Sequence, residues 1–413
     1  MFRRVNEGII LIILVFLFWS CAKKVEPPSV VIWTGMVNQS EIEMLRGLAK
    51  EFRDSTGVEV KVFTVPFSDL QNKFQIAAPT GQGPDIITGP QDWIGIFGAA
   101  NLILPLPEGF LTSEEERDFL PLSLAGMSYE GKRDGLPLTV EAIAIIYNKN
   151  LLPTLPSTME ELLKEAVSLT DKEKGKFGFL FDITNFYYCY PFFSARGAYA
   201  FGYDKEKGYI PEDLGLCGPQ AVEAATLLYD LMSGKYKLIP LGTNYDSMQS
   251  EFMGEKVAMI INGPWAVGDY KKAGINYGVM PFPPFKDGKY PHPLVGVLGV
   301  MVNKKAKHIN EALKFVKFMN SLENQLKIYK ALQRIPARRS AWQDPAIAND
   351  PDMQAFIKSA ELGEPMPNIP VMSCIWQPMA EELTLIVKGQ VPPDEGINIA
   401  CRRMKAAIER LLR

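Results

Sequence analysis

Two kinds of side chain in this sequence suit a ligand that is polar at its edge and apolar on its face. Asp92 follows a short apolar run and Glu141 lies inside a long one, where a carboxylate must find hydrogen-bond donors. Trp265 ends the run Ala258-Met-Ile-Ile-Asn-Gly-Pro-Trp265, and Trp376 supplies a second indole. A sugar ring offers hydroxyl donors to carboxylates and a C–H face to aromatic rings, so this combination favours a carbohydrate ligand.

Paired carboxylates also suit a glycoside hydrolase, with Asp92 and Glu141 as the two acids. Asp85, directly after a Gly-Pro pair, is interpreted instead as a turn or cap residue. The chain lacks GxSxG, HExxH and the Walker phosphate loop, and its two histidines, His292 and His308, lie near no nucleophile motif. These absences count against other hydrolases, dehydrogenases and ATPases, and against a metal site or cofactor.

A dense aromatic run, Phe186-Tyr-Tyr-Cys-Tyr-Pro-Phe-Phe193, predicts the start of a helix with most of its rings in the core. Adjacent tyrosines such as Tyr187 and Tyr188 can also bind ferric iron, which stays open as a minor alternative. The cysteines Cys189, Cys217, Cys374 and Cys401 lack CxxC spacing, and we expect free buried thiols. A Cys189–Cys217 disulfide is the alternative that an oxidising compartment would allow.

The N-terminus has the pattern of an export signal. Residues 1–20 contain two arginines followed by an apolar run, and Cys21 comes directly after that run. We expect Cys21 to be lipidated and residues 21–29 to form a tether, with a plain signal peptide or an uncleaved anchor as the alternatives. Removing residues 1–20 changes the net charge from −3 to −4, because two Arg and one Glu leave. This mild acidity argues against a nucleic-acid partner.

The chain has 413 residues, 47% of them apolar, which favours two lobes over one. Apolar runs with strand character alternate with segments of helical periodicity, which predicts an α/β fold with a largely parallel sheet. Ligands of such sheets bind beyond the carboxyl ends of the strands, so residues 33–38 and 88–93 are candidate site loops. The predicted strands are 30–33, 58–65, a third one with the turn at 83–87, 136–148, one that ends before Trp265, and 294–302. The predicted helices include 41–55, 69–78 and 309–332.

The long apolar runs are long enough to pass between lobes. The simplest topology has three crossings, with residues 30–139 and 295–333 in one lobe and residues 142–292 and 337–413 in the other.

Seven short motifs occur in order along most of the chain. They are Gly83-Pro-Asp-Ile-Ile87, Pro137-Leu-Thr-Val-Glu-Ala142, Ile146-Tyr-Asn-Lys-Asn-Leu-Leu-Pro153, Ile261-Asn-Gly-Pro-Trp-Ala266, Asn276-Tyr-Gly-Val279, Val295-Gly-Val-Leu298 and Met366-Pro-Asn-Ile-Pro-Val-Met372. Together they resemble the maltose/maltodextrin-binding proteins, the substrate-binding components of carbohydrate ABC importers. This resemblance implies a periplasmic-binding-protein fold, with two α/β lobes, a hinge of crossing segments and an interlobe ligand cleft.

The resemblance also implies roles for site residues. Asp92 and Glu141 match carboxylates that accept bonds from sugar hydroxyls. Met366 matches a further contact near the cleft. The rings that match stacking positions are Tyr187, Trp265 and Trp376.

Four positions depart from the family pattern. Gly89 stands in place of a tryptophan, Trp93 and Ala380 each replace an arginine, and Asn185 replaces a glutamate. An arginine exchanged for Trp93 loses a charged donor and gains a stacking face, which favours a longer or differently linked oligosaccharide.

We therefore expect an extracytoplasmic, lipid-anchored monomer that captures an α-linked maltodextrin and delivers it to an ABC importer permease without acting on it chemically. The alternatives are the glycoside hydrolase, a binder of another glycan, and the ferric-ion binder.

Overall fold

The computed structural model describes residues 28–36 and 38–413. The predicted signal segment and Cys21 lie outside these residues. The first strand, β1, spans Ser29–Thr34, so it begins at the last residue of the predicted tether. Within the described ranges, no helix is both long enough and apolar enough to cross a membrane.

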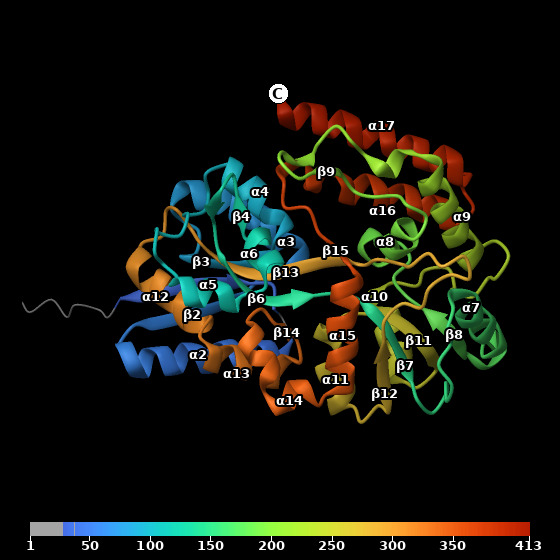
Figure 1. The fold of residues 1–413 in the computed structure, drawn as a ribbon, viewed down its shortest axis with the longest axis horizontal. Coiled ribbons are helices and arrows are strands. Elements are labelled where there is room, and N and C mark those ends of the chain that lie inside the picture. Colours follow the sequence, from blue (N-terminus) through green and yellow to red (C-terminus); the bar gives the residue numbers. More distant parts are fainter. Residues whose placement is uncertain (1–27, 37) are drawn as a thin grey trace, which may run out of the picture.

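The larger of two main sheets has the strand order β14-β6-β13-β3-β1-β2, with β15 paired to β13 (Figure 1). As predicted, β1, β2 and β3 are parallel. The sheet is mixed beyond them, because β13 runs antiparallel to both β3 and β6. The other strands of this sheet are β2 (Glu59–Thr64), β3 (Ile86–Pro90), β6 (Leu136–Glu141), β13 (Leu294–Val302), β14 (Ile335–Pro336) and β15 (Glu364–Pro365).

The smaller sheet has four strands in the order β12-β7-β11-β8. These strands are β7 (Ala144–Asn148), β8 (Phe177–Leu180), β11 (Val257–Asn262) and β12 (Tyr277–Met280). The predicted single strand over residues 136–148 is therefore two strands, β6 and β7, which belong to different sheets. Ala142 and Ile143 make this connection, and both are fully buried. The chain thus passes from one sheet to the other immediately after Glu141.

Local capping signals set the ends of the helices on the larger sheet. Helix α2 (Gln39–Thr56) begins with a capping box in which Asn38 and Glu41 bond each other's backbone N–H, and it ends at Gly57 in the left-handed conformation. The predicted helix over 309–332 is two helices, α12 (Ile309–Met319) and α13 (Leu322–Leu332). Ser321 separates them because its side chain caps α13 by accepting from the Asn324 N–H.

The remaining elements complete both lobes. The other helices are α3 (Phe67–Ala77), α4 (Asp92–Ala99), α5 (Ser113–Asp118), α6 (Pro121–Gly126), α7 (Met159–Ser168), α8 (Phe186–Ser194), α9 (Pro219–Met232), α10 (Tyr245–Met253), α11 (Val267–Lys272), α14 (Pro345–Ala348), α15 (Pro351–Leu362), α16 (Ser373–Val387) and α17 (Pro393–Leu412). Two short hairpins are β4 (Ser128–Tyr129) with β5 (Lys132–Arg133), and β9 (Gly202–Asp204) with β10 (Gly208–Ile210).

Apolar side chains cover both faces of the larger sheet. One face packs against α2, α12 and α13, and Val30 and Ile32 of β1 point into this layer. The other face packs against α3 and α4 through Phe74, Ile87 and Phe97. A third and larger cluster surrounds the smaller sheet and extends into α8, α9, α16 and α17. Each sheet therefore carries its own core, as expected for a two-lobed α/β protein.

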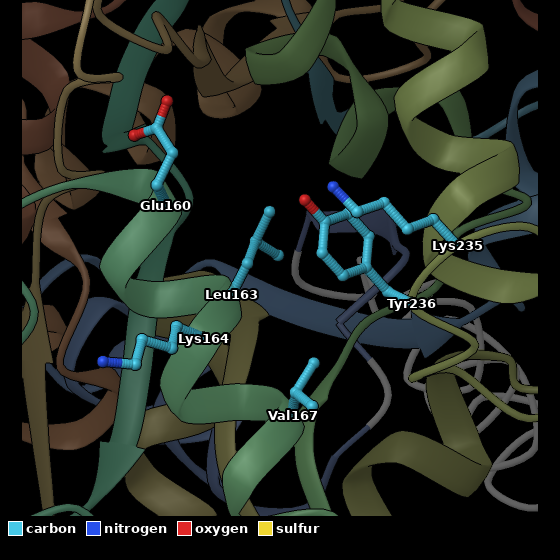
Figure 2. A pocket seen from close by; sticks show the side chains of 6 residues that line it. All are labelled: Glu160, Leu163, Lys164, Val167, Lys235 and Tyr236. Carbon is cyan, nitrogen blue, oxygen red and sulfur yellow. The ribbon is translucent and has the colours of Figure 1, made fainter.

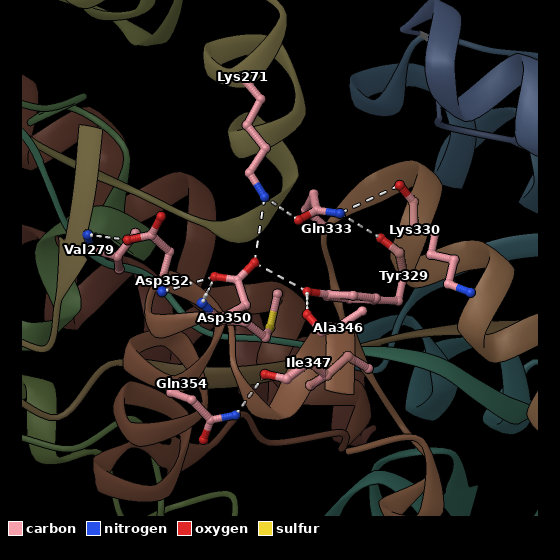
Figure 3. A network of polar contacts seen from close by, with 11 residues as sticks. Lys271, Val279, Tyr329, Lys330, Gln333, Ala346, Ile347, Asp350, Asp352 and Gln354 are labelled. Carbon is pink, nitrogen blue, oxygen red and sulfur yellow. Dashed lines mark hydrogen bonds and ion pairs between the residues drawn. The ribbon is translucent and has the colours of Figure 1, made fainter. Parts of the chain in front are cut away.

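A polar network joins α13, which packs on the larger sheet, to elements around the smaller one (Figure 3). The Tyr329 hydroxyl donates to Ala346 O at 2.8 Å and to Asp350 Oδ2 at 3.2 Å. Lys271 of α11 lies 3.5 Å from the same Asp350 oxygen and also donates to Gln333. Asp352 accepts from the Val279 N–H of β12 at 3.1 Å. The end of α13 is thus held in place from the opposite lobe.

The prediction of free buried thiols was wrong for Cys217 and Cys401, and the alternative Cys189–Cys217 disulfide was wrong as well. Cys217 and Cys401 form a disulfide that ties the segment before α9 to helix α17 across 184 residues of sequence. Cys189 is instead a fully buried free thiol, and its sulfur bonds Ile183 O at 3.2 Å. Cys189 and Cys374 are free as predicted, although Cys374 is only partly buried.

We predict that Cys217→Ser with Cys401→Ser lowers the free energy of unfolding by about 2–4 kcal/mol, because the bond restricts a long loop in the unfolded chain. Denaturant titration with and without dithiothreitol measures this. The reductant should bring the wild type to the stability of the variant and leave the variant unchanged. Equal stability of the oxidised wild type and the variant would contradict the prediction.

Candidate functional site

Asp92 and Trp376 meet between the two lobes. Asp92 is the first residue of α4, directly after β3, and Trp376 lies in the first turn of α16. The Trp376 Nε1–H donates to Asp92 Oδ2 at 3.0 Å. Burial raises the pKa of Asp92 to about 6, and the indole bond only partly opposes this effect. The pair joins a helix of the larger sheet to a helix of the other lobe through one carboxylate oxygen.

Glu141 ends β6 and is 8% exposed. Its Oε1 accepts from the Thr139 hydroxyl and from Arg334 Nη1, the latter at 3.0 Å, whereas Oε2 is buried without a protein partner. Arg334 follows α13 and also pairs with Glu41 in the first turn of α2. Burial opposes the charge of Arg334, but the two carboxylates outweigh it and raise its pKa. Glu141 is therefore a positioned acceptor with one oxygen free.

Aromatic rings lie beside these acids. Tyr187, in the first turn of α8, is half-buried, and its ring centroid is 6.3 Å from that of Trp265. Burial raises the pKa of Tyr187, and the charges of Glu141 and Asp92 raise it further. Both acids are thus close enough to act on the same phenol. The edge of Trp376 meets Phe186 of α8 with centroids 6.2 Å apart. The structure brings these predicted acids and rings together.

Two other predicted residues lie next to this group with structural contacts of their own. Asn185 is exposed and caps α8, since its side chain accepts from the Tyr187 N–H at 3.1 Å. Met366 is buried, and its carbonyl accepts from the Gln91 side chain. The Met366 N–H donates to Val295 O at 3.0 Å, which attaches it to the crossing strand β13. A ligand contact by either residue stays a prediction.

Trp93 does not present the open stacking face that the sequence predicts. It is 5% exposed and packs at 5.9 Å from Phe97. Phe67 stacks on it with centroids 5.4 Å apart and planes inclined by 28°. A side chain at Gly89 would collide with the Trp93 ring, so these two departures from the family pattern are linked in space. Trp93 is too enclosed to offer a ligand its whole ring.

Asp85 has the structural role predicted for it. Its Oδ2 accepts from the Val31 N–H at 2.8 Å, and its Oδ1 accepts from the N–H groups of Lys307 at 2.7 Å and His308 at 3.2 Å. The buried carboxylate therefore ties β1 to the loop after β13 and has no part in the site.

Two surface hollows lie elsewhere. One of about 440 Å³ is lined by α7 residues, which include Glu160 and Leu163, and by Lys235 and Tyr236 opposite them (Figure 2). Another of about 650 Å³ lies around α5 and α6. Neither contains a predicted site residue. Among the residues that the structure describes, no group of three His, Cys, Asp or Glu side chains could hold a metal ion.

Sequence reasoning missed Arg334 and Glu41. Glu41 was visible only as the start of a helix, and Arg334 only as a charge between a helix and a short Ile-Pro segment. The one available signal was Glu141 itself, because a buried acid in an apolar run needs a partner. Arg334 lies 193 positions further along the sequence, and this separation concealed the pairing.

Two α/β lobes, crossing segments between them, and acids and aromatic rings collected where they meet define a two-lobed binding protein of the periplasmic type. Residues 47–355 match the model of the bacterial extracellular solute-binding protein family. Because this match covers most of the chain, the protein belongs to that family.

Similar proteins bind oligosaccharides. The chain is 30% identical to the galactooligosaccharide-binding protein of Bacillus subtilis, over 92% of this chain and 89% of that protein. It is 31% identical to the maltotriose-binding protein of Pyrococcus abyssi, over 84% of this chain and 75% of that protein. The structure of the Thermus thermophilus maltotriose binding protein bound with maltotriose superposes with a TM-score of 0.85 at 34% identity, covering 93% of this chain and 100% of that one.

We predict that Arg334→Met lowers the free energy of unfolding by about 3–5 kcal/mol, because it leaves Glu141 and Glu41 buried without their cation. Chemical denaturation measures this. Arg133→Met is the matched control, since its pair with Glu116 is partly exposed and should cost less than about 1 kcal/mol. Adding Glu41→Gln and Glu141→Gln to Arg334→Met should restore part of the loss. Equal losses in the two arginine variants would argue against a structural role for the buried cluster.

Proposed function

We propose that this protein captures an oligosaccharide, an α-linked maltodextrin, between its lobes and delivers it intact to an ABC importer. The observation that carries the proposal is the gathering of Asp92, Glu141, Tyr187, Trp265 and Trp376 between the two lobes. The Oε2 of Glu141 is buried without a hydrogen-bond partner, which supports its role as an acceptor for a sugar hydroxyl. In the proposal, the rings supply faces for the apolar side of a pyranose.

Two classes of sugar are candidates for the bound oligosaccharide. Relatives of similar identity are named for galactooligosaccharides and for maltotriose. The resemblance of the site motifs to maltodextrin binders, and the likeness to a structure bound with maltotriose, favour the α-linked glucan.

The glycoside hydrolase alternative has weaker support. The raised pKa of Asp92 suits a general acid, but a positioned carboxylate also serves recognition. Glu141 is held by Thr139 and Arg334 as a fixed acceptor, and the family is one of solute-binding proteins. Incubation with labelled maltohexaose separates the two functions, because a binder returns the oligosaccharide unchanged.

The ferric-ion alternative requires phenolate ligands. Burial raises the pKa of both Tyr187 and Tyr188, and neighbouring negative groups raise the pKa of Tyr187 further. This environment disfavours the deprotonated phenols that ferric iron needs.

The match to an extracellular solute-binding family supports a location outside the cytoplasm, and we propose that Cys21 anchors the protein there through a lipid. A pneumococcal relative, 28% identical over 91% of this chain, is named as a maltooligosaccharide ABC transporter solute-binding lipoprotein. In this proposal the protein acts as a monomer, and its partner is the importer's permease. Mass spectrometry of the membrane-extracted protein tests for a diacylglycerol on Cys21.

We predict saturable binding of α-linked glucans by isothermal titration calorimetry. The ligand series is maltose, maltotriose, maltohexaose, a galactooligosaccharide and cellobiose. Trp265→Ala should weaken binding at least tenfold, about 1.4 kcal/mol, by removing one stacking face. Trp342→Ala, which removes a half-buried indole outside the site, is the matched control and should keep the affinity. Binding of the galactooligosaccharide alone would change the proposed sugar, and binding of no sugar would reject the function.

We also predict that sugar affinity falls as pH drops below about 6. A sugar hydroxyl that donates to Asp92 favours its charged form, so protonation of Asp92 in the free protein opposes binding. Affinity should be level above pH 7 and decrease by up to about tenfold per pH unit below 6. Asp92→Asn should abolish this slope. Asp134→Asn is the matched control, because burial also raises the pKa of Asp134 to about 6, and it should retain the slope.

A further inference from the structure

Phe67 is an exposed aromatic residue in an unusual setting. It is the first residue of α3 and is 55% exposed, whereas Trp93, on which it stacks, is 5% exposed. One ring of the pair therefore faces solvent and the other forms its support. Exposed apolar residues that stand alone need no explanation, but an exposed ring held by a second ring is a prepared surface.

The pair lies at the edge of the sheet where ligands of α/β proteins bind. Phe67 follows the carboxyl end of β2, and Trp93 follows that of β3. Gly35 follows the carboxyl end of β1, and a Cβ placed there would come within 2.9 Å of Phe67 Cδ2. All three strands are parallel, so these residues meet at one edge. Asp92 of the candidate site directly precedes Trp93 in α4.

Neighbouring residues fix the position of the Phe67 ring. Trp93 contacts Phe97, and the space above Gly89 is taken up by the Trp93 ring. Gly35 lacks the side chain that would push the Phe67 ring away. A ring seated this way loses little conformational entropy when a ligand packs on it, which favours its use in binding.

We infer that Phe67 is a further stacking face of the sugar site, which Trp93 holds in position, and that it selects longer oligosaccharides. This inference rests on the proposed function. Asp92, Trp376, Tyr187 and Trp265 contact the sugar units at the centre, and Phe67 contacts an additional unit on the side of the larger sheet. Trp93 thus acts through Phe67 as a positioning residue.

The test compares Phe67→Ala with the wild type by calorimetry, with maltose and maltohexaose as probes. The variant should weaken maltohexaose binding about tenfold and change maltose binding less than twofold. Phe67→Tyr keeps the ring and should restore the preference for maltohexaose. Phe67→Leu keeps apolar volume without a ring and should behave as Phe67→Ala. Gly35→Ala displaces the ring and should reduce the preference for maltohexaose in the same direction.

Ile76→Ala is the matched control. Ile76 is 75% exposed near the far end of the same helix, about 13 Å along the axis from Phe67, and its removal should leave both affinities unchanged. If Phe67 only covers Trp93, Phe67→Ala will lower stability and leave the ratio of the two affinities as in the wild type, which overturns the inference alone. If the wild type binds neither sugar, the proposed function fails and the inference fails with it.

Discussion

A buried arginine joins the segments on which the rest of this structure depends. Arg334 comes at the end of α13, and its two carboxylate partners begin α2 and end β6. The net stability of such a cluster is modest, because desolvation offsets most of the attraction, but loss of any one member leaves a charge buried alone. The cluster therefore specifies how α2, β6 and the segment after α13 are arranged relative to one another. It fixes the start of α2, the strand that leaves the larger sheet and the orientation of Glu141.

The same carboxylate chemistry connects the lobes. Asp92 begins α4, which packs on the larger sheet, and it accepts a hydrogen bond from the Trp376 indole of the other lobe. In the function we propose, the sugar hydroxyl donates to the same carboxylate that accepts the indole N–H of the other lobe. A ligand shifts a conformational balance only through contacts that differ between the states, so a carboxylate already engaged across the lobes matters to the proposed closure. The network of Lys271, Asp350 and Tyr329 holds the lobes together at a second place.

Much of the fold could be predicted because its signals are local. The parallel strands β1 to β3 and the helices between them were visible in apolar periodicity, and β13 was predicted with its observed bounds. The predicted continuous helix over 309–332 and the predicted continuous strand over 136–148 were both wrong. In each case the pattern of apolar residues does not show where one element ends and the next begins. Ser321 caps a new helix, and the run through Glu141 changes sheets at Ala142 without any change in hydrophobicity.

The sequence by itself determined the residue types of the site, two acids and several rings at strand ends, and the alternation of elements that carries them. Only the tertiary structure decided the partners: Arg334 for Glu141, Trp376 for Asp92, Cys401 for Cys217, and Phe67 rather than solvent over Trp93. The physical reason is that periodicity and capping act between residues a few positions apart, whereas these contacts join residues far apart or on separate helices. Which ones meet depends on how the crossing strands bring the two lobes together.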